Sequence, residues 1–79
     1  MVSELREFVD ADKVIFGMRE CLRNGKKLGR VFIASDTRHE MHDEIKKLGI
    51  EVEQIELSKK EISDKLGIEF LCEVFGVKK

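Results

Sequence analysis

The sequence predicts an α/β fold, a three-layer α/β/α sandwich around a small four-stranded mixed sheet. Two observations predict this class: the kinds of segment that the chain contains and the order in which they alternate. Short apolar runs, typical of strands, alternate along the chain with segments whose apolar residues recur every three or four positions, as on one face of a helix. The expected order is a helix followed by three strand–helix pairs and a last strand. Such alternation favours helices packed on both faces of one sheet.

Length and composition indicate the number of domains, the kind of surface and the cellular location to expect. With 79 residues, we expect one domain spanning residues 1–79. The net charge is -1, so a surface for nucleic acid would have to come from local segregation of charge. A charged content of 39% with one Asn and one Gln suggests a thermophilic source. Without a long apolar run or a signal peptide, we expect a cytoplasmic protein with no membrane contact.

The first half of the chain predicts a helix, a strand and a second helix. Residues 3–9 carry apolar side chains at helical spacing after a Ser that can cap a helix. Lys13–Phe16 is a short strand. We expect the next helix to run from Gly17 to about Asn24, with Gly25 as the residue that ends it.

The middle of the chain predicts the central strand and a third helix. Arg30–Ala34 is continuously apolar after its first residue, which is typical of a strand covered on both faces. Thr37 and Glu40 have the spacing of a capping box, so we expect a helix to begin at Thr37 and to end at Gly49.

The last third predicts a strand, a helix and a final strand. Ile50–Leu57 alternates imperfectly between apolar and polar residues. Ser58 and Glu61 form a second capping box, and Gly67 ends the helix that it starts. Glu69–Val77 is the last predicted strand.

The helix after Gly17 has one apolar side and one charged side. At 100° per residue, Arg19, Glu20 and Arg23 fall together on the charged side. We expect Lys26, Lys27 and Arg30 to extend this side into a basic surface. Periodicity alone also allows an ordinary solvated helix face.

Catalytic, cofactor and metal sites have little support in the sequence. No nucleophile elbow, glycine-rich nucleotide loop or metalloprotease motif is present. His39 and His42 are three residues apart, and we read them as a solvated helix start in preference to a metal site. Cys21 and Cys72 are too few and too far apart for a structural zinc site. We expect them to be small, half-buried apolar residues, with a disulfide as the alternative.

Four motifs in order resemble one known family. They are Gly17-Met18-Arg19-Glu20-Cys21-Leu22-Arg23, the strand Val31–Asp36, the helix start Ser58-Lys59-Lys60-Glu61-Ile62, and Gly67-Ile68-Glu69-Phe70 followed by Cys72. Together they resemble the ribosomal L-seven-Ae / L-thirty-e superfamily of kink-turn RNA-binding proteins. The chain looks like a divergent, short member, archaeal or thermophilic.

The resemblance implies a non-catalytic protein, ribosomal or ribonucleoprotein-associated, that binds kink-turn-like structured RNA without a cofactor. The partner would be rRNA or a small RNA, together with ribosome or ribonucleoprotein components, and the free protein would be a monomer. The implied RNA-binding residues are Gly17, Arg19, Glu20, Arg23, Lys26 and Lys27 in a first part, and Ile68, Glu69, Phe70, Leu71 and Cys72 in a second part.

A second reading within the same superfamily is a protein–protein interaction module with reduced or lost RNA binding. Glu73 favours it, because the family usually has a small neutral residue there. If the carboxylate faced RNA, it would repel phosphate. The near-neutral net charge favours it too.

Overall fold

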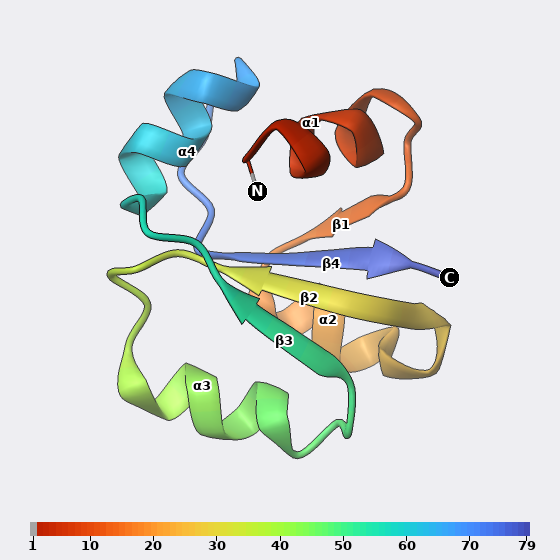
Figure 1. The fold of residues 1–79 in the computed structure, drawn as a ribbon. Coiled ribbons are helices and arrows are strands. Elements are labelled where there is room, and N and C mark those ends of the chain that lie inside the picture. Colours follow the sequence, from red (N-terminus) through yellow and green to blue (C-terminus); the bar gives the residue numbers. More distant parts are fainter. Residues whose placement is uncertain (1) are drawn as a thin grey trace.

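The computed structural model describes residues 2–79, and at Val2 only the backbone. It contains a four-stranded sheet with two helices on each face (Figure 1). The elements are α1 (Val2–Asp10), β1 (Val14–Phe16), α2 (Met18–Arg23), a short 3-10 helix (Gly25–Lys27), β2 (Leu28–Ile33), α3 (His39–Lys46), β3 (Glu51–Gln54), α4 (Lys59–Leu66) and β4 (Val74–Lys78). The predicted order of elements is confirmed.

The sheet is mixed, with the strand order β1-β4-β2-β3. β4 pairs antiparallel with both β1 and β2, whereas β2 pairs parallel with β3. β2 and β4 are therefore the two central strands. The predicted fold class, an α/β sandwich with a small four-stranded mixed sheet, is confirmed.

Each face of the sheet carries its own hydrophobic core, because side chains alternate along the central strands. α1 and α4 cover one face and α2 and α3 cover the other (Figure 1). The α1–α4 core contains Leu5, Phe32, Ala34, Ile55, Ile62, Leu66, Cys72, Phe75 and Val77. The α2–α3 core contains Cys21, Leu28, Val31, Ile33, Ile45 and Val74.

α4 begins and ends as its sequence predicts. The Ser58 side chain accepts a hydrogen bond from the backbone N–H of Glu61, and the Glu61 side chain accepts one from the backbone N–H of Ser58. Gly67 caps the C-terminus in the left-handed conformation, with a φ of 70°. Asp36, which follows β2, accepts a further hydrogen bond from the Lys59 N–H at 3.0 Å and so ties α4 to the central strand.

The predicted start of α3 is wrong. The helix begins at His39, with Arg38 at the N-cap and no side-chain capping bond. Thr37 is buried, and its hydroxyl donates to the backbone carbonyl of Glu73 at 3.2 Å. A tertiary contact therefore uses the hydroxyl that a capping box with Glu40 would need.

Other predicted boundaries also shift; β2, for example, covers Leu28–Ile33 in place of the predicted Arg30–Ala34. α2 ends at Arg23 with Asn24 as its C-cap, so Gly25 lies at the predicted position directly after the cap, where it also starts the 3-10 helix. β3 covers only Glu51–Gln54 of the predicted strand, and β4 begins at Val74. The residues before β4 therefore form a loop, which is the loop that carries the second part of the predicted site. No helix within residues 2–79 is long and apolar enough to span a membrane.

Candidate nucleic-acid interface

The corner between β1 and α2 is fixed by its backbone. Gly17 has a φ of 95°, a conformation that side-chain-bearing residues rarely adopt. Its N–H donates to the carbonyl of Val74 at 2.9 Å. This bond places the start of α2 beside the first residue of β4, directly after the loop of residues 68–73.

The loop of residues 68–73 is held against α4 and β1. The buried Ser63 hydroxyl donates to the carbonyl of Phe70 at 2.8 Å, and the Ile68 N–H donates to the carbonyl of Ser63 at 3.1 Å. The Phe70 ring lies edge-to-face against Phe16, with 5.3 Å between the ring centroids. The two predicted parts of the site, far apart in sequence, are therefore neighbours in space.

A hollow of about 360 Å³ lies between these two segments, and we call it the β1–loop hollow. Its lining residues are Phe16, Gly17, Met18, Met41, Lys59, Phe70, Leu71, Cys72 and Glu73. Gly17 and Phe70–Cys72 were predicted from the sequence to belong to the site. Phe16, Met18, Met41 and Lys59 were not predicted, because these residues reach the hollow only through the packing of β1, α2, α3 and α4.

The charged side of α2 faces solvent. Arg19, Glu20 and Arg23 are all exposed, and none of them lines the β1–loop hollow. An Arg23 guanidinium nitrogen lies 3.7 Å from a Glu20 carboxylate oxygen. This exposed pair one helical turn apart contributes little to stability. Both side chains are therefore available for contacts outside the chain.

Lys26 and Lys27 are exposed beyond the C-terminal end of α2. They lie at the opposite end of this helix from Gly17. The structure therefore spreads the predicted first part of the site along the whole length of α2.

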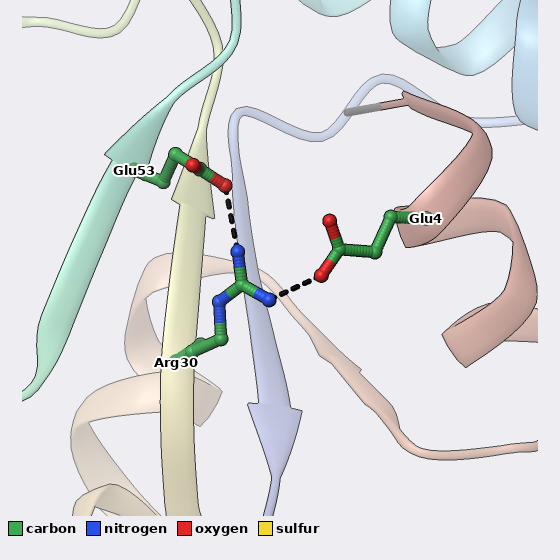
Figure 2. A network of polar contacts seen from close by, with 3 residues as sticks. All are labelled: Glu4, Arg30 and Glu53. Atoms are coloured by element: carbon green, nitrogen blue, oxygen red, sulfur yellow. Dashed lines mark hydrogen bonds and ion pairs between the residues drawn. The ribbon is translucent and has the colours of Figure 1, made fainter.

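Arg30 is not part of this basic surface, contrary to the sequence analysis. Its side chain lies on the opposite face of the sheet, where the guanidinium bridges Glu4 of α1 and Glu53 of β3, at 2.8 Å from Glu53 (Figure 2). It also lies over the Phe32 ring, 4.7 Å from the centroid. The pairing of β2 with β4 shifts register between Leu28 and Arg30, so Leu28 faces the α2–α3 core while Arg30 faces α1.

The loop residues of the second part differ in exposure. Phe70 and Leu71 are exposed large apolar side chains, at 50% and 61%, and Glu69 is exposed as well. Ile68 is half-buried against the α1–α4 core. Cys72 is only 6% exposed, and its thiol donates to the carbonyl of Val74 at 3.0 Å, so its side chain is committed to the interior.

Glu73 lies in the lining of the β1–loop hollow and is bound to the start of α3. Its side chain is 17% exposed, and a carboxylate oxygen lies 3.8 Å from an Arg38 guanidinium nitrogen. Its backbone carbonyl accepts from the Ala34 N–H and the Thr37 hydroxyl. The Arg38 guanidinium therefore offsets part of the negative charge that Glu73 brings to the hollow.

Cys21 and Cys72 are both buried and both free thiols. Burial raises the pKa of Cys21 to about 11 and also raises that of Cys72. The neutral thiol is the stable form of each near neutral pH. Among residues 2–79, no group of three His, Cys, Asp or Glu side chains is arranged to hold a metal ion.

The chain resembles known proteins in its fold but not in its sequence. The sequence matches no protein-family model and no curated protein. The structure is similar to a 15.5 kD RNA-binding protein of Giardia lamblia, with a TM-score of 0.79 and 18% identity over 99% of this chain and 70% of that one. It is also similar to a protein of unknown function from Bacillus halodurans, with a TM-score of 0.84 and 17% identity over 99% of this chain and 83% of that one. At these identities the likeness shows that the fold is shared.

Proposed function

We propose that the chain is a non-catalytic RNA-binding protein of the L-seven-Ae / L-thirty-e type, acting in a ribosomal or ribonucleoprotein context on kink-turn-like structured RNA. The observation that carries the proposal is the meeting of the Gly17 corner and the Phe70–Cys72 loop around one hollow. The charged side of α2 continues outward from this corner. We propose that these two segments of the sequence motif together form the RNA-binding surface.

The chemistry of the surface suits an RNA with a widened groove. Arg19 and Arg23 each present a planar guanidinium that can bind guanine O6 and N7 or a phosphate through two hydrogen bonds. Glu20 can accept hydrogen bonds from guanine N–H groups. Side chains reach base edges where an internal loop opens the groove, as sheared G·A pairs do.

The loop supplies the apolar half of the proposed surface. The exposed ring of Phe70 and the side chain of Leu71 offer a platform for an unstacked nucleotide, and Ile68 supports it from the core side. The shared fold with an RNA-binding protein of Giardia lamblia supports the same assignment.

A titration with two matched RNAs tests the proposal. One is a short kink-turn duplex, and the other is the same duplex with its sheared G·A pairs replaced by Watson–Crick pairs. We expect tighter binding of the kink-turn, with an affinity that falls as salt rises because Arg side chains displace counterions from phosphates. Equal affinity for the two RNAs at moderate salt would contradict kink-turn recognition.

The variant Arg23→Ala sharpens the test. It should weaken kink-turn binding by about 1–3 kcal/mol if the guanidinium makes two hydrogen bonds to one base. Arg6→Ala is a matched control, since Arg6 is an exposed arginine of α1, on the opposite face of the sheet. Equal losses in both variants would mean that only overall charge matters.

A second candidate is a protein–protein interaction module. The exposed apolar pair Phe70 and Leu71 favours it, because side chains of this kind often anchor protein interfaces. Co-purification before and after nuclease treatment separates the two candidates. Partners that are retained through Phe70 after RNA is removed would favour the protein-binding function.

A further inference from the structure

A second hollow lies at the other end of α2, and we call it the α2–α3 hollow. Its volume is about 630 Å³. Its lining residues are Leu22, Arg23, Asn24, Gly25, Lys26, Lys27 and Leu48. It shares no residue with the β1–loop hollow, and the proposed RNA surface gives most of these residues no role.

The floor of the α2–α3 hollow is aliphatic. Leu22 is 39% exposed, although it lies on the apolar side of α2, and Leu48 is half-buried against the α2–α3 core. Leu48 packs close to the backbone of Gly25, because a Cβ atom at this position would lie only 3.2 Å from Leu48 Cδ2. Exposed aliphatic surface in a concave site gains free energy when an apolar side chain covers it.

The rim of the hollow is cationic. Arg23, Lys26 and Lys27 line it, and no acidic residue does. In the part of the chain that the structure describes, Lys26 and Lys27 have no carboxylate within ion-pair distance, and Arg23 has only Glu20, at 3.7 Å. Within the described residues, the charges of Lys26 and Lys27 beside this aliphatic floor are therefore not paired with a carboxylate of the chain itself.

We infer that the α2–α3 hollow docks an acidic segment of a protein partner. An aliphatic side chain of this segment packs on Leu22 and Leu48, and carboxylates on either side of it pair with Lys26 and Lys27. The hollow lacks an aromatic ring, so it offers no platform for stacking a base, which favours a protein segment over single-stranded RNA. Arg23 belongs both to this hollow and to the proposed RNA surface, but the contacts inferred here use Leu22, Leu48, Lys26 and Lys27, none of which lines the β1–loop hollow.

Titration with synthetic peptides tests this inference, with backbone amide shifts as the measurement. The probe is a short peptide in which aspartates flank a central leucine pair. One control peptide replaces the leucines by serines, and another replaces the aspartates by lysines. We expect saturable shifts at residues 22–27 and 48 with the probe alone.

Two variants locate the contacts within the hollow. Leu22→Ser should weaken peptide binding about tenfold, the factor expected when one aliphatic contact is lost, and should leave affinity for kink-turn RNA unchanged. Lys26→Glu combined with Lys27→Glu should abolish peptide binding. Circular dichroism and thermal melts establish that both variants are folded.

Three outcomes would overturn the inference. They are an absence of saturable shifts with the probe, equal binding of the serine control peptide, and shifts at residues 22–27 and 48 with kink-turn RNA that exceed those at Gly17. The last would mean that the hollow is an RNA surface. Loss of kink-turn binding alone would count against the proposed function and leave the docking site standing.

Discussion

Phe70→Ala tests whether the loop before β4 is a stacking platform for RNA, as proposed. Its ring is half exposed, so Phe70→Ala removes about half of the up to ~3 kcal/mol that a fully buried side chain contributes. Loss of the edge-to-face contact with Phe16 adds about 0.5–1.5 kcal/mol. We expect the free energy of unfolding to fall by about 2 kcal/mol, which leaves a folded protein if the wild type has an ordinary stability of at least ~5 kcal/mol.

The loss of binding free energy for RNA should be similar in size to the loss of stability, and it appears as a large change in Kd. Stacking of one base on an aromatic side chain contributes about 1–3 kcal/mol, so Phe70→Ala should raise the Kd for kink-turn RNA about 5-fold to 150-fold. Fluorescence anisotropy with a labelled RNA measures the Kd, at a temperature where a urea melt shows the variant to be folded.

A matched control removes another exposed apolar side chain. Leu22→Ala acts at the far end of α2, outside the β1–loop hollow. It should lower stability slightly and leave the Kd for RNA unchanged. If Phe70→Ala bound kink-turn RNA as tightly as the wild type, the assignment of the loop as a stacking platform would be wrong.

Three further predictions concern the scaffold. Glu4→Gln should lower the free energy of unfolding by about 0.5–1 kcal/mol, because it weakens the pair with Arg30; urea melts should show this loss shrinking at high salt. Ser58→Ala should cost about 1 kcal/mol through loss of the α4 cap, whereas Ser58→Asp should keep most of the stability in the same melts. Burial raises the pKa of Cys21 from 9.0 to about 11, so the folded protein holds this proton more tightly than the unfolded chain does. The free energy of unfolding should therefore fall as pH rises from 9 to 11, and urea melts across this range should show a smaller fall for Cys21→Ala.

Local signals predicted the fold well where local contacts decide the structure. The capping box at Ser58 and the left-handed Gly67 bound α4 as expected, because both depend on residues within one turn of the helix. The same spacing at Thr37 failed, since the hydroxyl bonds to the carbonyl of Glu73, which lies 36 residues away in sequence. A pattern match cannot tell whether a distant group competes for the same atom.

The sequence predicted which segments form the candidate site. It did not predict which other residues line the hollow between them. The family resemblance named Gly17 and the loop around Phe70, and the structure places both beside one hollow. The contributions of Met41 and Lys59 depend on how α3 and α4 pack, which their sequence spacing does not encode. The position of Arg30 was mistaken because one irregularity in β2 decides which face of the sheet it occupies.

We propose that the Gly17 corner, the charged side of α2 and the loop before β4 act as one RNA surface. The most direct measurement is a backbone amide NMR titration with a short kink-turn RNA. We expect saturable shifts concentrated at residues 17–23 and 68–73 together, with one common Kd. Shifts in only one of the two segments, or shifts no larger there than over α1, would contradict it.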